Sequence, residues 1–115
     1  MEKVKSKFEL IRNLEDGWNG EKAKKIDVDF VNEIEKIVLG LDIEPQVYPT
    51  PNGTIQIEYE EENKYLEFEF SPENLKEHKA IAFCKWNKGK ETAFEIMGDN
   101  LTESINILLE GYNNL

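Results

Sequence analysis

The sequence predicts an α+β domain of two layers, in which helices cover one face of an antiparallel sheet. Two patterns carry this prediction. Apolar residues recur at helical spacing near both ends of the chain, whereas residues 54–97 alternate apolar and polar residues with period two. The expected order is two N-terminal helices, a four-stranded antiparallel sheet made of two hairpins, and a C-terminal helix. With 115 residues, the chain is expected to form a single domain, 1–115.

The first helix is expected before residue 17. Val4, Phe8, Ile11 and Leu14 lie on one helical stripe, with Lys and Glu residues between them. Gly17 is expected to end this helix, because a glycine just past the last turn readily adopts the left-handed conformation. Residues 18–26 then form an irregular connector.

A second helix is expected after the connector, with Asp27 or Asp29 as its N-cap. The segment YPTPNG at 48–53 has turn chemistry, because its prolines exclude helix and Asn-Gly tolerates a positive φ. The expected core-facing residues of this helix and the loop after it are Phe30, Ile34, Ile37, Val38 and Leu41.

Two hairpins are predicted in the alternating region. Residues 54–60 and 64–70 form the first around Glu62-Asn63, with Ile57 opposite Phe68 on the buried face. A polar loop or short helical turn follows at 71–78. Residues 80–86 and 91–97 form the second hairpin around Lys88-Gly89. Its expected register buries Phe83 opposite Phe94 and Ile81 opposite Ile96.

The C-terminal helix is expected to begin near residue 101. Asp99 or Asn100 provides the N-cap, because short polar side chains accept hydrogen bonds from the first free N–H groups. Its apolar stripe consists of Leu101, Ile105, Leu108 and Tyr112.

Glutamates dominate the predicted solvent face of the sheet. Successive outward residues of a strand lie about 6.8 Å apart, and Glu58 faces Glu67 directly, which costs stability. Three interpretations are open: a solvated surface, a docking face for a basic protein, or a metal site, which a flat ladder of carboxylates fits poorly. The candidate partner-binding residues are Glu58, Glu60, Glu67, Glu69 and Glu95.

A shallow apolar patch is expected on the outer side of the second hairpin, where Ala82, Cys84 and Ala93 lie beside Trp86. Exposed apolar patches usually mark contacts. Either the connector that holds Trp18 covers this patch, or a partner does.

No catalytic constellation is evident. His78 is the only histidine and has no Cys or His nearby to complete a zinc site. Cys84 lies within a strand, where cysteine is commonly a small packing residue. The serines lack the context of a nucleophile, and GWNGEK lacks the spacing of a phosphate-binding loop. The sequence therefore predicts a protein that is not an enzyme and that uses no cofactor and no metal.

The net charge of −10 lies almost entirely after residue 25. Such a surface repels nucleic acid and anionic membranes and attracts a basic protein, although it also serves solubility alone. The single cysteine favours a reducing compartment. The charged start lacks the apolar core of a signal peptide, so a cytoplasmic protein is expected.

Two blocks of this chain, L-x-D-G-W-x-G-x-x-A-x-x-I and P-T-x-x-G-x-I-x-I-E-Y, resemble an uncharacterised family of small bacterial and phage proteins. In that family the blocks read roughly L-x-x-G-W-D-G-x-G-A-x-P-I and P-T-x-D-G-x-I-x-L-E-W. The resemblance spans residues 10–60, about half of the chain. It implies no activity, and it favours an interaction role in a mobile element. Asn19, Lys22, Lys25 and Tyr59 depart from the family pattern. The matching residues are Leu14, Gly17, Trp18, Gly20, Ala23 and Ile26, then Pro45, Val47, Pro49, Thr50, Gly53, Ile55, Ile57 and Glu58.

The matched residues of the first block are packing and backbone types. Trp18 is therefore interpreted as a structural anchor that closes the connector onto the sheet, with Gly17 and Gly20 supplying unusual dihedral angles. Two classes of function remain. The first is an acidic interaction protein, such as an antitoxin, immunity or inhibitor-like factor, that docks a basic partner. The second is a small-ligand module with a pocket near Trp18 and Trp86.

Overall fold

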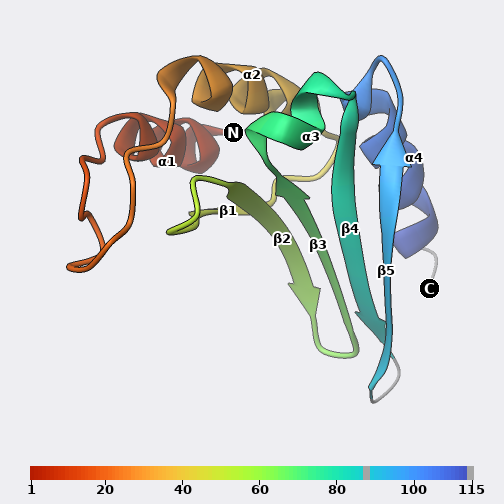
Figure 1. Ribbon diagram of the computed structural model, residues 1–115. Helices are drawn as coiled ribbons and strands as arrows, with labels where there is room; N and C mark the ends of the chain where they lie inside the picture. The colour runs from red at the N-terminus through yellow and green to blue at the C-terminus, as the bar shows by residue number, and fades with distance from the viewer. Residues whose placement is uncertain (87–88, 114–115) are drawn as a thin grey trace.

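The computed structural model describes residues 1–86 and 89–113. Within them, five strands form one antiparallel sheet in the order β1-β2-β3-β4-β5, with four helices around it (Figure 1). The α+β class and the C-terminal helix are confirmed, whereas the expected four strands and three helices are too few. The elements are α1 (Glu2–Arg12), α2 (Val28–Leu39), β1 (Gln46–Pro49), β2 (Ile55–Glu61), β3 (Lys64–Phe70), α3 (Pro72–Lys76), β4 (Lys79–Trp86), β5 (Lys90–Met97) and α4 (Leu101–Asn113).

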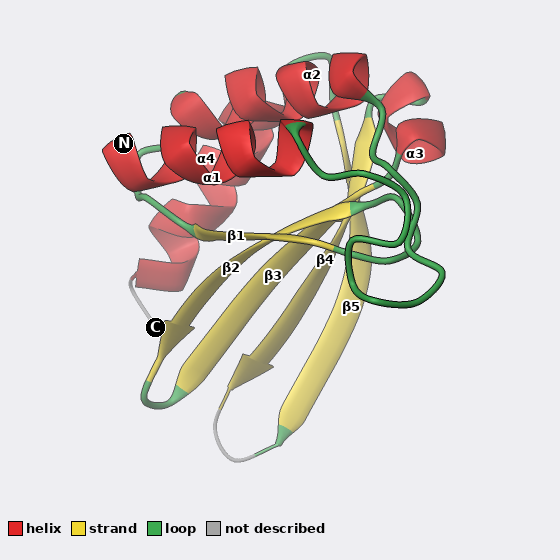
Figure 2. Cartoon of the chain, turned by 90° about the vertical axis from the view of Figure 1, so that its left-hand side faces the viewer, coloured by secondary structure: helices red, strands yellow, loops and turns green. Residues whose placement is uncertain are grey.

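The three longer helices share one face of the sheet. Figure 2 shows α1, α2 and α4 on the same side of the curved strands. Their buried residues join those of the strands in one hydrophobic core, which includes Phe8 of α1, Ile34 of α2 and Ile105 of α4. We call the other side of the sheet the outer face. None of these three helices covers it in the part of the chain that the structure describes.

The helix ends follow the expected capping chemistry, with one correction. The Asp27 carboxylate accepts a hydrogen bond from the Phe30 N–H at 3.0 Å, and the Asn100 side chain accepts one from the Glu103 N–H at 3.1 Å. However, α1 ends at Arg12 rather than near Gly17. The Lys25 ammonium donates to the carbonyl oxygens of Arg12, the last residue of α1, and of Leu14, so a cation from the connector lies at the C-terminus of this helix.

The first hairpin has the predicted register, with Ile57 opposite Phe68 and the turn at Glu62-Asn63. The strand β1 was not predicted. It pairs with β2 and places Val47 opposite Ile57, on the buried side. Its last residue is Pro49, which an edge strand tolerates because the missing N–H leaves no gap in an interior ladder.

The second hairpin differs from its predicted register by one residue. Phe83 lies opposite Ala93 rather than Phe94, and Ile81 lies opposite Glu95 rather than Ile96. The strand β4 therefore turns Ala80 and Ala82 into the core, where both are fully buried. Of the predicted turn Lys88-Gly89, Lys88 lies outside the described residues.

Small side chains face the core along β4 because α4 packs against this part of the sheet. Ala80 and Ala82 belong to the same core as Ile105 and Leu109 of α4. A helix that lies on a sheet needs room for its own large side chains, and alanine in the strand provides that room. The larger Ile81 and Phe83 consequently lie on the outer face, half-buried.

Two tyrosines at the edge of the core donate hydrogen bonds to backbone carbonyls. The Tyr59 hydroxyl donates to the Ile43 carbonyl at 2.7 Å, and the Tyr112 hydroxyl donates to the Tyr59 carbonyl at 3.2 Å. Burial, followed by the nearby charge of Glu61, raises the pKa of Tyr112 to about 12. Burial also raises the pKa of Tyr59.

We expect the fold to lose stability at alkaline pH. Tyr112 binds its proton more tightly when folded than when unfolded, so its contribution is complete below pH 10.0 and is lost as the pH rises toward about 12. Melting temperatures measured across this range should fall, and Tyr112→Phe should reduce the fall. An equal fall in both proteins would contradict the assignment to Tyr112.

Candidate functional site on the outer face of the sheet

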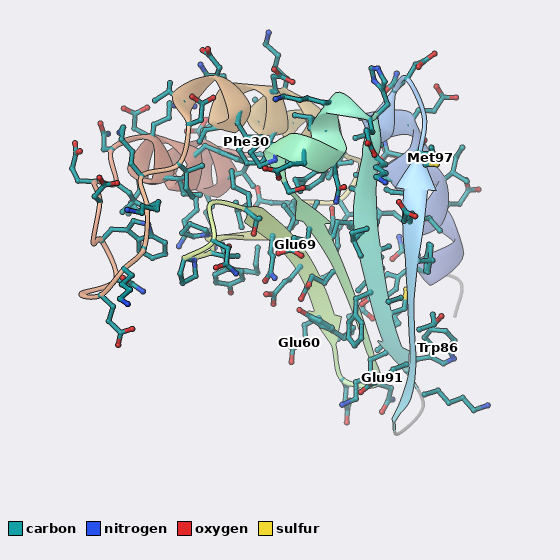
Figure 3. All side chains as sticks on the ribbon, viewed as in Figure 1. Phe30, Glu60, Glu69, Trp86, Glu91 and Met97 are labelled. Carbon is teal, nitrogen blue, oxygen red and sulfur yellow. The ribbon has the colours of Figure 1, made fainter. Side chains whose placement is uncertain are left out.

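The outer face gathers carboxylates from three strands, as the alternation predicts. Glu58 and Glu60 of β2 share this face with Glu67 and Glu69 of β3, and Glu58 lies directly opposite Glu67. Glu95 of β5 lies opposite Ile81, on the same face. In Figure 3, the side chains of Glu60, Glu69 and Glu91 project from the front of the sheet. The five predicted residues are therefore brought together on one surface.

Neutral hydroxyls accompany the carboxylates at the centre of this face. The Tyr65 hydroxyl donates to the Glu67 carboxylate at 2.7 Å, and the Thr54 hydroxyl donates to that of Glu69 at 2.9 Å. Lysine partners lie nearer the β5 edge instead. Lys79 contacts Glu95 at 2.8 Å, and Lys85 lies 3.7 Å from Glu91. The negative charge is therefore least compensated over β2 and β3.

The surroundings of Glu58 disfavour the ionised form of its carboxylate. It is half-buried, and no lysine or arginine among the described residues forms an ion pair with it or with Glu67. Burial raises the pKa of Glu58, and the charges of Glu67 and Glu60 raise it further, against a lowering by the Tyr65 hydroxyl. Holding this group ionised at neutral pH therefore costs folding free energy.

An aromatic pair lies within this acidic surface. The rings of Tyr65 and Phe83 meet edge to face, with 6.1 Å between their centroids. Both rings are half-buried, and they line an open hollow of about 670 Å³ together with Glu58, Glu60 and Glu91. Sequence reasoning missed this pair, because it placed Phe83 in the core.

The predicted outer patch of small residues is not formed as expected. Ala93 does lie on the outer face, but Ala82, Cys84 and Trp86 lie on the side of the helices. Cys84 and Trp86 line a second, largely apolar cavity of about 370 Å³ between α4 and the sheet. The reason is the orientation of β4. Its even-numbered residues face the helices, whereas the sequence predicts them on the outer face.

The connector does not cover this part of the sheet. Figure 1 shows it beside α1, on the opposite side of the molecule from β4 and β5. Gly17 and Gly20 have φ values of +78° and +83°, as their proposed role requires. The Trp18 indole N–H donates to the Lys24 carbonyl at 3.1 Å, so this side chain closes the connector on itself. Trp18 is only half-buried, whereas Ala23 and Ile26 are 1% exposed.

We expect Trp18→Ala to lower the free energy of unfolding by about 1 to 2 kcal/mol, because a half-buried ring loses less packing than the 3 to 5 kcal/mol of a core aromatic. Trp18→Phe should recover most of this loss, since it keeps a ring and removes only the donor to Lys24. Chemical denaturation of the two variants measures both quantities. A loss typical of core residues would show that Trp18 anchors the whole fold.

The remaining reactive residues do not assemble into a site. His78 is exposed on the loop before β4, and its φ is +57°. Cys84 is half-buried, and burial raises the pKa of its thiol, which keeps it protonated at neutral pH. Within residues 1–86 and 89–113, no group of three His, Cys, Asp or Glu side chains is arranged to hold a metal ion.

Comparisons of this chain with protein-family models, with curated proteins and with solved structures found no match. The resemblance to the bacterial and phage family therefore stays a prediction. No helix in the described part of the chain has both the length and the apolar character needed to cross a membrane.

Proposed function

We propose that this chain is a small acidic interaction protein, without enzymatic activity, that binds a basic protein surface through the outer face of its sheet. The observation that supports it best is the pair Glu58–Glu67, which has no lysine or arginine ion-pair partner among the described residues and lies on the side of the sheet away from α1, α2 and α4. Such a pair lowers stability without improving packing. An intracellular role of the antitoxin, immunity or inhibitor type in a bacterial or phage mobile element agrees with this proposal.

The composition of the face suits protein recognition. Interfaces commonly combine a desolvated aromatic centre with a polar rim. Here Tyr65 and Phe83 provide the centre, and the glutamates provide a rim that attracts cations. An arginine of the partner fits this arrangement, because its guanidinium both stacks on aromatic rings and pairs with carboxylates.

The double variant Glu58→Thr with Glu67→Thr tests the cost of the acidic pair. We expect it to be as stable as the wild type or more stable, by up to about 1 kcal/mol, because it removes repulsion and adds residues that favour strands. The pKa of Glu58 is raised in the fold, so the stabilisation should be larger at neutral pH than near pH 4. Thermal melts at both pH values measure it, and a destabilised variant would contradict the repulsion.

Binding is tested by a pull-down from a lysate of the source organism at two salt concentrations. The wild type, the Glu58/Glu67 double variant and a charge-matched control serve as baits. Glu33→Gln with Glu103→Gln is the control, because both residues are exposed and lie on α2 and α4, which pack on the other side of the sheet. A basic protein that the wild type and the control retain, and that the double variant releases at lower salt, supports the proposal. Equal retention by all three baits contradicts it.

A small-ligand module is the second candidate. The cavity between α4 and the sheet favours it, since apolar hollows of this size commonly hold ligands. Trp86 lines that cavity, whereas Trp18 lies with the connector on the far side of the molecule. The pocket expected between the two tryptophans is therefore replaced by one that Trp86 shares with α4.

A further inference from the structure

The two edges of the sheet differ in how they are protected. The edge strand β1 has four residues, ends in Pro49 and packs beside α1. The edge strand β5 has eight residues and no proline, and no strand of residues 1–86 and 89–113 pairs with its outer side. Short strands and prolines are two of the devices that prevent an edge from pairing with another chain, and charged side chains are a third. The β5 edge lacks the first two, and its charges Glu91 and Glu95 would repel an acidic strand but attract a basic one.

The register shows which backbone groups of β5 are free. The Gly98 N–H donates to the His78 carbonyl at 3.0 Å, at the end of the β4–β5 ladder. Hydrogen-bonded pairs alternate along an antiparallel ladder. The residues Thr92, Phe94 and Ile96 therefore bond to β4. The residues whose N–H and C=O groups point away from the sheet are Glu91, Ala93, Glu95 and Met97.

An apolar cavity lies beneath this edge. It has a volume of about 370 Å³ and is lined by Thr92 and Phe94 of β5 and by Ile107 and Leu108 of α4, among others. Ile107 is 64% exposed, so α4 presents a large apolar side chain to solvent beside this cavity. Side chains of a strand added to β5 would point alternately toward α4 and toward the outer face. Those pointing toward α4 would meet Ile107 and the cavity.

The carboxylates on the outer face of β5 determine which outward side chains a paired strand should carry. Glu91 and Glu95 are exposed on the outer face of β5, with Ala93 between them. A neighbouring strand places its outward side chains directly beside these carboxylates. We propose that β5 pairs with an extended segment of a partner protein in which apolar residues alternate with lysine or arginine. The apolar side chains cover Ile107 and the cavity, and the cations face Glu91 and Glu95.

A second copy of this chain fits the edge less well. Pairing β5 with itself brings its own glutamates together, and each copy carries a net charge of −10. A basic segment removes this repulsion. The inference concerns the edge of the sheet and does not rest on the proposed use of its outer face.

The probe is a synthetic peptide of alternating lysine and isoleucine, seven residues long, with blocked ends. We expect it to slow hydrogen exchange of the Ala93 and Glu95 amides at least about tenfold, because these N–H groups become paired. It should also slow modification of Cys84, the only cysteine, by a small thiol reagent, because Cys84 lines the covered cavity. Binding with neither effect, or no binding at about 1 mM peptide, overturns the inference.

Matched controls separate pairing from simple charge attraction. A peptide of the same composition, with its lysines and isoleucines in two blocks, should bind at least about tenfold more weakly. Ala93→Pro removes one outward donor and should weaken binding, whereas Ala93→Val keeps the donor and should not. The Glu58/Glu67 double variant should bind the alternating peptide as the wild type does. If that variant alone loses binding, the peptide sits on the outer face and the edge inference is wrong.

Discussion

Replacing Phe68 with alanine is expected to lower the free energy of unfolding by about 3 to 5 kcal/mol, the range for a fully buried phenylalanine. Phe68 is 0% exposed and lies in β3, the central strand of the sheet. Its neighbours across the strands are Ile57 on one side and Ala82 on the other. Because strands hold the backbone in place on both sides, the structure has little freedom to collapse into the vacated volume.

Urea denaturation of Phe68→Ala measures this loss, and Phe83→Ala is the matched control. Both residues are phenylalanines in interior strands, but Phe83 is half-buried on the outer face. Its removal should cost less than half as much, because part of its surface already contacts water. A larger loss for Phe83 than for Phe68 would place the core on the other side of the sheet.

The second large effect is expected from Ala82→Phe, which should destabilise the fold by about 3 kcal/mol or more. Ala82 is fully buried opposite Phe68 and Phe94, in the core that includes α4. A phenyl ring at this position has no space unless α4 moves away from the sheet. The expected result is therefore a lower melting temperature together with increased exposure of the α4 core residues to hydrogen exchange.

Ala93→Phe is the control for this variant, since it makes the same chemical change on the outer face. Ala93 is exposed, so the added ring meets solvent and should change stability by no more than about 0.5 kcal/mol. Equal stability of the two alanine variants would contradict the orientation of β4 that turns Ala82 toward the core.

The first hairpin could be predicted residue by residue, whereas the second could not. In β2 and β3, every large apolar residue has a charged or polar neighbour, so one face is clearly the buried one. The β4 sequence AIAFC is apolar on both faces, and period two alone does not tell which face is buried. The prediction places Ile81 and Phe83 in the core because they are the larger side chains. In the structure, the small Ala80 and Ala82 face the core instead, because α4 needs the space there.

A signal for the correct face was present in the sequence. Lys79 and Lys85 have the same parity as Ile81 and Phe83, and two lysines on one side of a strand indicate the solvent face. In the structure, these lysines pair with Glu95 and Glu91 on the outer face. Strand β1 was missed because four residues are too few to show a period and because its last two, Tyr48 and Pro49, belong to the segment YPTPNG, which has turn chemistry.

The glutamates of the candidate site could be predicted from the sequence, whereas the aromatic pair Tyr65–Phe83 could not. The glutamates alternate in strands whose register is set locally by a short turn, so their common face follows from the sequence. The Tyr65–Phe83 contact depends on the pairing of β3 with β4, which are separated by α3 and its flanking residues. Contacts of this kind depend on the register between hairpins, which no single segment specifies.

The strand order has a consequence for how the chain folds. Every strand pairs with its immediate neighbour in sequence, so each step of sheet formation closes only a short loop. Rates of folding correlate inversely with the mean sequence separation of contacting residues. A sheet in sequential order is therefore expected to form faster than one of equal size with crossed connections. The helix α4 follows all five strands in the sequence, and its core residues Ile105 and Leu109 share the core with Ala80 and Ala82, so the burial of these alanines is complete only when α4 is in place.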